Sequence, residues 1–483
     1  MLFKRKPRDY QLEDFERSKD MKVFALLYHM GLGKSKVTND TAIHLYAKGK
    51  INAVVIIAPN GIHTKWARED FPNDMPDEMN YVVGVWKSGS QLAMDSCENL
   101  FLPGPHLRLL CMNIEALSRK NSPAELFLKK FLNATDCLLV IDESDTIKNP
   151  DAKRTETLLK LGDKAAYKRI LTGTPINNSV FDLYSQFNFL DTDIFGQSFT
   201  SFKHTYANIL PPTHPTVLAI MAKGARWVPT LVEKDSEGKP KWKNLDKLQD
   251  AIRPYCVVRK KTDHLDLPDK IYESIYYDLD KKQRQIYDQL AKNAKVELEN
   301  DSVTVVHKLT LLLRLQQVLA GFLPGDTTEG LIPLFKDPKD NPRIQALLTA
   351  LDNHVGQAII WCRFTDEIRM IEKILGADCV TYYGETKDRD AKMALYKEGK
   401  VRYLVSNTAT GGAGLNLTNS HLAIYYSNDF SYRNRAQSED RQHRIGQTES
   451  VVCLDIVADN TMDTKIVKIL RDKKDISVQT MRL

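Results

Sequence analysis

The chain has 483 residues, of which 42% are hydrophobic and 27% charged, and a formal net charge of +6. This length predicts about two to four domains, and the composition excludes an intrinsically disordered protein. The mild positive charge permits a nucleic-acid partner without requiring one. No apolar run approaches the roughly 20 residues of a membrane span, so we expect no membrane association. The seven cysteines lack metal or redox spacing, which favours free thiols in a reducing compartment.

The basic start of the chain, KRKPR at residues 4–8, has two interpretations. It is either a solvated charge run or a nuclear address. It lacks the apolar core of a secretion signal.

Short apolar runs rich in β-branched residues recur along the first part of the chain. They cover residues 23–29, 52–59, 107–113, 136–144 and 167–175. A second set covers residues 357–364, 378–384, 401–407 and 421–429. Because these runs are apolar on both faces and alternate with helical stretches, they predict buried parallel strands. We therefore predict an α/β fold with two halves, separated by a more helical and loop-rich middle.

The run 23–29 leads directly into a Gly-rich turn, HMGLGKS, at residues 29–35. Gly33, Lys34 and Ser35 match the second half of a P-loop, whose backbone N–H groups, lysine and hydroxyl bind phosphates and Mg²⁺. The first glycine of that pattern falls at position 28, where this chain has Tyr28. Standing alone, the half motif fits a nucleotide-binding loop and a plain Gly-Lys turn equally well.

The run 136–144 contains an acidic pair, Asp142 and Glu143. At the carboxyl end of a parallel strand beside a P-loop, Asp142 can hold Mg²⁺ and Glu143 can polarise an attacking water. By itself such a pair is a common surface feature. Together with the Gly-rich turn upstream, it favours an ATPase site.

Two segments of the second half carry further chemistry. Arg441 and Arg444 are three residues apart, so on a helix they would share a face. Two adjacent guanidiniums repel unless an anion such as an ATP phosphate lies between them, and the alternative is an exposed helix salt-bridged through Glu439 and Asp440. The other segment, residues 406–420, is rich in glycines that allow close approach to a partner backbone.

Several segments follow one another as the motifs of superfamily 2 helicase-like ATPases do, and they resemble the SNF2 branch. In order they are RDYQLEDF (8–15), HMGLGKS (29–35), VVIIAPNGIHTKW (54–66), IDESDTIKN (141–149), LTGTPINN (171–178) and QSEDRQHRIGQ (437–447). The resemblance covers nearly the whole chain. A glycine is not usual at position 28 in this branch, but an acidic pair at 28 and 29 and a histidine at 145 are. This chain has Tyr28, His29 and Asp145 there.

The resemblance implies two RecA-like lobes, each a parallel sheet flanked by helices, with helical insertions between them. On this basis residues 1–195 form the ATP-binding lobe and 196–252 an insertion in it. Residues 253–342 form a linker and a helical protrusion of the second lobe, and 343–483 form the helicase C-terminal lobe.

The resemblance also implies site residues. The catalytic residues would be Lys34, Asp142, Glu143, Arg441 and Arg444, with Mg²⁺ held by Ser35 and Asp142. The ATP-binding residues would be Arg8, Tyr10 and Gln11 at the adenine, Met30, Gly31, Leu32, Gly33, Lys34 and Ser35 at the phosphates, and Gly414 and Gln437 in the second lobe. Residues 172–175, TGTP, would link the ATP site to nucleic acid.

The DNA-facing residues implied by the resemblance come from both lobes. They are Asn60, Gly61, Lys65, Trp66, Asn113, Arg363, Tyr383, Gly384, Thr408, Gly411 and Gly412. A tryptophan such as Trp66, taken alone, is more often a packing residue than a base-stacking one. Arg259, Lys260 and Lys261 either touch DNA or brace the lobes.

The function expected from the resemblance is an ATP- and Mg²⁺-dependent translocase on double-stranded DNA, which remodels or displaces what is bound there. Two alternatives stay open, a strand-separating or annealing helicase and a catalytically weak DNA-binding scaffold. We expect a monomeric motor like the compact versions of bacteria and phages. It would be cytoplasmic in a bacterium or an infected host, or nuclear in a eukaryote.

Overall fold

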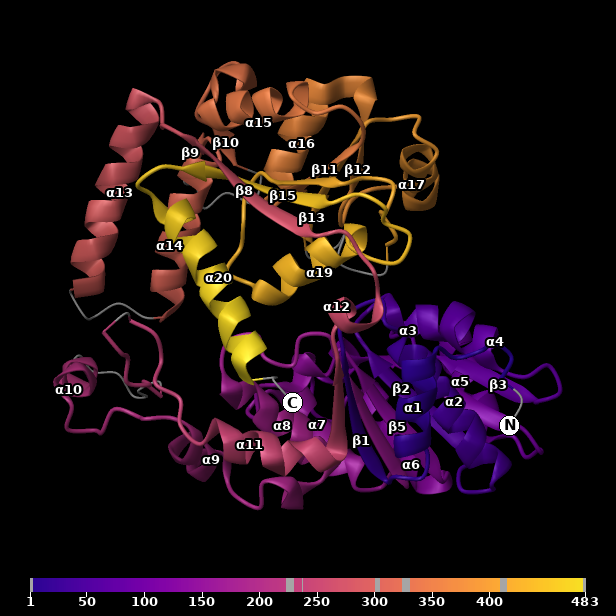
Figure 1. Ribbon diagram of the computed structural model, residues 1–483. Coiled ribbons are helices and arrows are strands. Elements are labelled where there is room, and N and C mark those ends of the chain that lie inside the picture. The colour runs from indigo at the N-terminus through magenta and orange to yellow at the C-terminus, as the bar shows by residue number, and fades with distance from the viewer. Residues whose placement is uncertain are drawn as a thin grey trace. The chain divides into compact units, whose positions relative to one another are not determined.

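The structure is a computed structural model that describes residues 3–222, 230–236, 238–299, 305–323, 331–408 and 415–480. The chain divides into two compact units (Figure 1). The first comprises residues 1–208, 234–265 and 475–483, and the second comprises 209–233 and 266–474.

The first unit is built on a seven-stranded sheet of order β3-β4-β2-β5-β6-β1-β7. All neighbouring strands are parallel. The strands are β1 (Val23–Tyr28), β2 (Ala53–Ala58), β3 (Tyr81–Val85), β4 (Leu107–Asn113), β5 (Cys137–Asp142), β6 (Tyr167–Leu171) and β7 (Cys256–Arg259). A parallel sheet needs crossover helices on its faces, so both faces of these strands must be apolar.

The central strand β2 shows how the sequence meets this requirement. Ala53, Val55 and Ile57 belong to one hydrophobic cluster. The alternate residues 54, 56 and 58 belong to another, and all six are buried. Helices accordingly cover both faces of the sheet (Figure 1). Among the described residues, the α-helices of the first unit are α1 (Asp9–Ser18), α2 (Lys34–Ala47), α3 (Ile62–Lys65), α4 (Phe71–Asp74), α5 (Gln91–Glu98), α6 (Pro123–Ala134), α7 (Lys153–Gly162), α8 (Leu183–Leu190), α9 (Phe199–Tyr206), α11 (Leu245–Ile252) and α12 (Lys261–His264).

The edge strand β7 lies in residues 253–342, which the family resemblance assigns to a linker and a helical protrusion of the second lobe. It pairs in parallel with β1, in a register that places Tyr28 opposite Arg259. A strand of four residues is too short to show a periodic pattern, so its pairing was not predicted. The segment that leads toward the second unit is therefore part of the first sheet.

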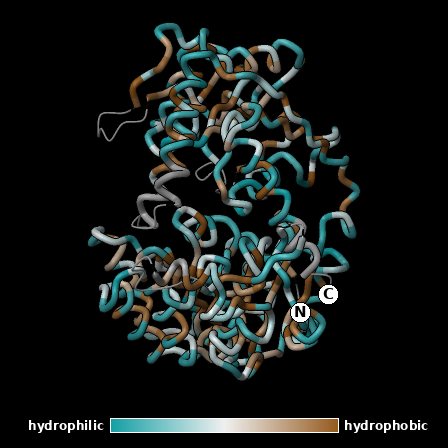
Figure 2. The backbone as a smooth tube through the Cα atoms, turned by 90° about the vertical axis from the view of Figure 1, so that its left-hand side faces the viewer, coloured by the Kyte–Doolittle hydropathy of each residue, from teal (hydrophilic) through white to brown (hydrophobic). Residues whose placement is uncertain are grey.

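The second unit contains a six-stranded sheet of order β12-β13-β11-β14-β15-β8, again parallel throughout. Its strands are β8 (Lys270–Tyr277), β11 (Ala358–Cys362), β12 (Cys379–Tyr382), β13 (Tyr403–Asn407), β14 (Leu422–Tyr425) and β15 (Val451–Ala458). Hydrophobic and hydrophilic stretches alternate along the chain in both units (Figure 2). The predicted fold class, α/β with two parallel sheets flanked by helices, is confirmed.

The helices of the second unit include the predicted helical middle. They are α10 (Pro215–Ala222), α13 (Lys281–Glu299), α14 (Val305–Leu319), α15 (Pro342–Asp352), α16 (Thr365–Leu375), α17 (Arg389–Lys397), α19 (Tyr432–Gln442) and α20 (Met462–Thr480). A small hairpin pairs β9 (Phe322–Leu323) with β10 (Ile332–Pro333). Among the helices of the described residues, none has the length and apolarity that crossing a membrane requires.

Helix α19 is fixed to the second sheet by a buried cluster of charges. Glu439 on the helix accepts hydrogen bonds from Arg435 Nε (2.8 Å), Lys270 Nζ (3.1 Å) and the Tyr272 hydroxyl (2.8 Å). Arg435 also binds Asp455 on β15. Burial alone would raise the pKa of Glu439, but Lys270 and Arg435 outweigh it and lower the pKa to about 2.

Glu439→Gln should therefore destabilise the second unit by about 3 kcal/mol at neutral pH, the cost of breaking a buried ion pair. A glutamate whose folded pKa is lowered stabilises the fold above its ordinary pKa of 4.5 and loses this contribution as the pH falls towards 2. The difference in melting temperature between wild type and variant should accordingly shrink across this window. Glu398→Gln, which removes an exposed pair with Lys400, is the control. A difference that does not change with pH would contradict the assignment.

Candidate functional site

The Gly-rich turn lies between β1 and α2 and needs two left-handed residues. Gly31 has φ +84° and Gly33 has φ +82°, values that glycine adopts without strain. A Cβ added at Gly33 would lie 2.3 Å from Nε2 of Gln11. Tyr28, by contrast, is the last residue of β1 and is fully buried, so the turn begins after it. This placement explains why the turn needs no glycine at position 28.

The RDYQLEDF segment rests directly on this turn. The Tyr10 hydroxyl and Gln11 Nε2 both donate to the Leu32 carbonyl, each at 2.9 Å. Gln11 Oε1 accepts from the Arg8 backbone N–H at 2.9 Å, which closes the first turn of α1. The three residues predicted at the adenine are thus gathered at one side of the predicted phosphate loop.

Helix α1 is also held at its other end. Arg169 on β6 is buried, and its guanidinium donates to the carbonyls of Ser18 (2.8 Å) and Met21 (2.9 Å). Burial lowers the pKa of Arg169 to about 9. Carbonyls at a helix C-terminus are acceptors without helical partners, so this arginine fixes where α1 ends.

The acidic pair stands at the carboxyl end of β5, as predicted. Asp142 and Glu143 are 8% and 7% exposed, and Glu143 adopts a left-handed backbone with φ +53°. Burial and the neighbouring Glu143 charge raise the pKa of Asp142 to about 6, although Lys34 and a hydrogen bond from Trp66 act in the opposite direction. Lys34 Nζ donates to the Tyr28 carbonyl at 3.1 Å. Lys34 is thus bonded to the end of β1 and also acts on the buried Asp142 carboxylate.

Trp66 makes the hydrogen bond that the sequence did not reveal. Its indole Nε1 donates to Asp142 Oδ2 at 2.8 Å, and the side chain is 1% exposed. The enclosed ring agrees with the packing role that a tryptophan taken alone favours, and the place of Trp66 near a DNA backbone stays a prediction. The ring orients a carboxylate of the candidate ATP site, across 76 residues of sequence.

The TGTP segment touches the Gly-rich turn. A Cβ added at Gly173 would lie 3.2 Å from the Tyr28 carbonyl oxygen and 3.3 Å from the Met30 nitrogen. The Thr172 hydroxyl accepts from the Thr174 N–H at 3.1 Å, which tightens the loop. The glycine therefore allows two backbones to approach closely at this point.

Asp145, which stands where the branch usually has a histidine, joins two motifs. It is 1% exposed, and its Oδ2 accepts from Asn177 Nδ2 at 2.7 Å. Nearby, the Ser144 hydroxyl donates to Gln186 Oε1 at 2.7 Å, and Gln186 Nε2 donates to the Pro175 carbonyl at 2.8 Å. The IDESDTIKN and LTGTPINN segments are thus tied together, and the aspartate is accommodated by an amide donor.

The remaining DNA-facing candidates of the first unit lie in exposed turns or at strand ends. Gly61 has φ +85° and open space around it. Asn60 is exposed, and Lys65, the last residue of α3, forms an ion pair with Asp70 at 2.9 Å. Asn113 ends β4, and its amide lies 3.4 Å from Glu115.

The second unit places the predicted arginines differently from expectation. Helix α19 ends at Gln442, and His443, with ψ +76°, leaves the helical conformation. Arg441 therefore lies in the last turn of the helix, whereas Arg444 lies beyond it, so the two do not share a helix face. Arg444 Nη1 donates to the Leu415 carbonyl at 3.3 Å. Gln437, the predicted ATP-binding residue on the same helix as Arg441, is 9% exposed.

The other predicted residues of the second unit are mostly enclosed. Burial lowers the pKa of the Arg363 guanidinium. Tyr383 is 8% exposed, whereas Gly384 beside it has open space around it. That these residues face DNA stays a prediction. Thr408 is 9% exposed. Gly411, Gly412 and Gly414 lie outside the described residues.

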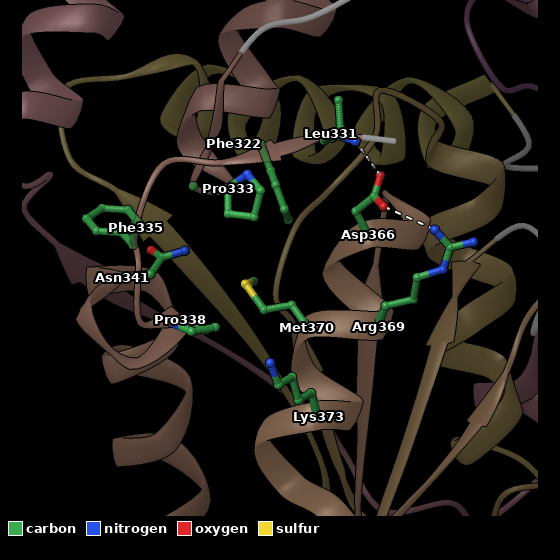
Figure 3. Close-up of a pocket in the computed structure, with 11 residues that line it drawn as sticks. Phe322, Leu331, Pro333, Phe335, Pro338, Asn341, Asp366, Arg369, Met370 and Lys373 are labelled. Atoms are coloured by element: carbon green, nitrogen blue, oxygen red, sulfur yellow. Dashed lines mark hydrogen bonds and ion pairs between the residues drawn. The ribbon is translucent and has the colours of Figure 1, made fainter. Parts of the chain in front are cut away.

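The second unit also has a half-open pocket between the β9–β10 hairpin and α16 (Figure 3). Apolar side chains such as Phe322, Pro333 and Met370 line it, and the Asp366–Arg369 ion pair lies at its rim. None of the predicted site residues lines this pocket.

Comparison with known proteins gives two family matches. The SNF2-related domain matches residues 18–320, and the helicase conserved C-terminal domain matches residues 342–446. The chain is 25% identical to the Mycoplasma genitalium protein named uncharacterized ATP-dependent helicase MG018, over 94% of this chain and 40% of the relative. It is 26% identical to Bacillus subtilis YwqA, provisionally named an ATP-dependent helicase/translocase, over 94% and 46%.

A eukaryotic relative is the human SWI/SNF-related matrix-associated actin-dependent regulator of chromatin subfamily A member 1. It is 26% identical, over 68% of this chain and 30% of its own length. The chain thus spans less than half the length of these curated relatives. Among solved structures, the Sulfolobus solfataricus SWI2/SNF2 ATPase core in complex with dsDNA aligns with a TM-score of 0.42 and 24% identity, covering 100% of this chain and 96% of that one.

The domain matches cover most of the chain, and they coincide with the ordered motifs whose geometry is described above. The chain belongs to the SNF2 family of helicase-like ATPases.

Proposed function

We propose that this chain is the motor part of an ATP-dependent translocase that moves along double-stranded DNA. The observation that carries the proposal is the meeting of Lys34, Asp142 and Glu143 at the carboxyl edge of one parallel sheet, where both carboxylates are buried. Ligands of open α/β sheets bind at this edge. Membership of the SNF2 family and the names of the bacterial relatives support the same function.

In this proposal the phosphates of ATP bind at the start of α2. The turn 30–35 leads into the N-terminus of α2, and its backbone N–H groups would donate to the phosphates. A helix N-terminus stabilises anions in this way. Lys34 exchanges its bond to the Tyr28 carbonyl for the β- and γ-phosphates. Tyr10 and Gln11, held against Leu32, position the adenine next to this turn.

The donor set at this site fits Mg²⁺. Magnesium in ATPases is held by one or two protein oxygens together with phosphate oxygens and waters. The Ser35 hydroxyl and the Asp142 carboxylate would hold it, and a cation beside Asp142 would oppose the burial and the Glu143 charge that raise the pKa of this carboxyl group. When bound, Mg²⁺ neutralises charge on the β- and γ-phosphates. Trp66 keeps the Asp142 carboxylate in one orientation.

Glu143 follows Asp142 and adopts a left-handed backbone conformation, with φ +53°. We assign it the polarisation of the attacking water. Arg441 and Arg444 supply the positive charge that stabilises the phosphate in the transition state. Hydrolysis and ADP release then alternate the grip of the two units on DNA, which moves the chain along it.

The grip on DNA would be made by phosphate contacts from both units. Gly61 and Gly384 offer open backbone, and Lys65 adds charge. Asn60, Asn113, Arg363, Thr408, Gly411 and Gly412 remain candidates for the same surface. Such contacts carry no sequence information, so binding should be sequence-tolerant and sensitive to salt.

The proposal predicts ATP hydrolysis that double-stranded DNA stimulates and that Lys34→Ala lowers by at least about 10²-fold, because the lysine stabilises transferred charge. Translocation is tested by displacement of a third strand from a DNA triplex with the duplex left intact. Lys48→Ala, at the exposed end of the same helix, is the control and should retain activity. Unwinding of a forked duplex would favour the strand-separating helicase instead. DNA binding without hydrolysis would favour a scaffold.

Trp66→Phe should lower kcat about tenfold while ATP binding, measured with a fluorescent analogue, changes little. The variant keeps an aromatic ring in the core but loses the N–H that orients Asp142, and partners of ligating groups typically contribute this much. Trp86→Phe is the matched control, because Trp86 is equally buried and its N–H donates to Ser88 at 3.3 Å. Equal effects of the two substitutions would show that packing alone is responsible.

A further inference from the structure

The segment through which the chain passes from the first unit to the second is bound tightly at both of its ends. We call residues 253–270 the connector. The boundary between the units falls after Leu265. The sequence left open whether the basic residues of this segment touch DNA or brace the fold, and the contacts of Arg259 and Lys270 bear on that question.

At the first end, Arg259 and Tyr28 both donate to the carboxylate of Asp14, and Tyr28 is the residue that precedes the Gly-rich turn. Arg259 Nε and Nη2 donate to the two oxygens of Asp14 at 2.8 and 2.6 Å. The Tyr28 hydroxyl donates to the same carboxylate, which is 1% exposed. The Arg259 carbonyl in turn accepts from the His29 N–H at 2.9 Å. The connector, α1 and the end of β1 are thus joined at Asp14.

The residues at which this chain departs from the SNF2 pattern take part in these contacts. Tyr28 and His29 stand where the branch usually has two acids, and an acid at position 28 would repel Asp14. The tyrosine hydroxyl donates instead. A second contact follows along the connector, where the His264 ring stacks on the Tyr10 ring at 4.4 Å. Tyr10 is the residue whose hydroxyl binds the Gly-rich turn at Leu32.

At the second end, the connector is bound to the helix that carries Arg441. His443 Nε2 lies 2.8 Å from the Pro268 carbonyl. Two residues further, Lys270 Nζ donates to Glu439 at 3.1 Å and to Asp440 at 3.3 Å. Asp440 immediately precedes Arg441. A displacement of the connector at Pro268 or Lys270 must therefore move the C-terminal end of α19 or break buried charge pairs.

We propose that the connector is a positioning device that couples the Gly-rich turn of the first unit to the arginine helix α19 of the second. Arg259 and Lys270 are its positioning residues. Neither residue contacts nucleotide in this proposal, and both act on residues that do. The inference deepens the proposed function and rests on it for the roles assigned to Lys34 and Arg441. It assigns Arg259 to bracing rather than to DNA.

The test is a double-mutant cycle on the kcat of ATP hydrolysis without DNA. Arg259→Lys keeps the charge but cannot bind both oxygens of Asp14, and Lys270→Met keeps the length but removes the charge. Each should lower kcat about tenfold, the loss expected when a catalytic group is displaced by a fraction of an ångström. Because both act through one connector, the double variant should lose no more than either single variant. If the two residues acted independently, their effects would multiply, and the double variant would lose about a hundredfold in kcat.

Three controls separate coupling from misfolding. Arg5→Lys removes an equivalent fork, the pair of 2.7 Å bonds from Arg5 to the buried Asp74, and should leave kcat unchanged. Lys270→Arg restores the charge and should recover most of the activity. Binding of a fluorescent ATP analogue should stay within about twofold for all variants, since the turn itself is intact. Multiplying effects, or an Arg5→Lys variant as impaired as Arg259→Lys, would overturn the inference.

Hydrogen exchange gives a second measurement, which does not require the Lys270→Met variant to fold. A non-hydrolysable ATP analogue should protect the peptide covering residues 30–36 in both wild type and Arg259→Lys. It should protect residues 435–445 in wild type alone. Protection of both peptides in the variant would overturn the inference. Because this experiment contains no DNA, its result is separate from that of DNA stimulation, on which the proposed translocase function depends.

Discussion

A carboxylate removed from water must be surrounded by donors, and Asp14 satisfies this requirement by drawing three elements together. Tyr28 from β1 and Arg259 from β7 both donate to it, and Asp14 itself belongs to α1. If one donor were lost, a buried charge would be left only partly compensated, at a cost of several kcal/mol. Asp14 therefore joins α1, the strand end before the Gly-rich turn and the last strand of the first sheet in one buried cluster.

The second unit applies the same principle around Glu439. Lys270, Arg435 and Tyr272 surround this carboxylate, and the Arg435 guanidinium also lies 3.4 Å from the centre of the Tyr425 ring. Such clusters contribute little net stability compared with apolar packing, but each charge accepts few alternative positions. Each unit thus holds its functional residues on a rigid frame.

Local sequence patterns predicted the parts of the site that local chemistry determines. Residues 29–35, the pair Asp142 and Glu143, and most of the central strands could be recognised because a turn, a strand end or an apolar run has its own signal. The bonds between these parts could not be recognised. Trp66 and Asp142 are 76 residues apart, and Arg259 and Asp14 are 245 apart. No periodicity or spacing relates such pairs, since they are brought together by the order of strands in the sheet.

The end of α19 shows a different limit. Helical spacing predicted a shared face for Arg441 and Arg444, but the helix ends between them at Gln442. Helix ends are set by tertiary contacts as much as by sequence, and here the ring of His443 is bound to the Pro268 carbonyl. Asp145 shows the same limit. The buried aspartate is stabilised by a hydrogen bond from Asn177, which lies 32 residues further along the chain.

The position of Tyr28 has a consequence for how such proteins are recognised. In this chain the strand continues through residue 28 and the turn is completed by Gly31 and Gly33. In this chain the glycine that the usual phosphate-loop signature places at position 28 is therefore not needed for the turn. A pattern search that demands it would reject this chain and any other whose strand runs on by the same length. A search anchored on the two left-handed glycines before the lysine would find this chain.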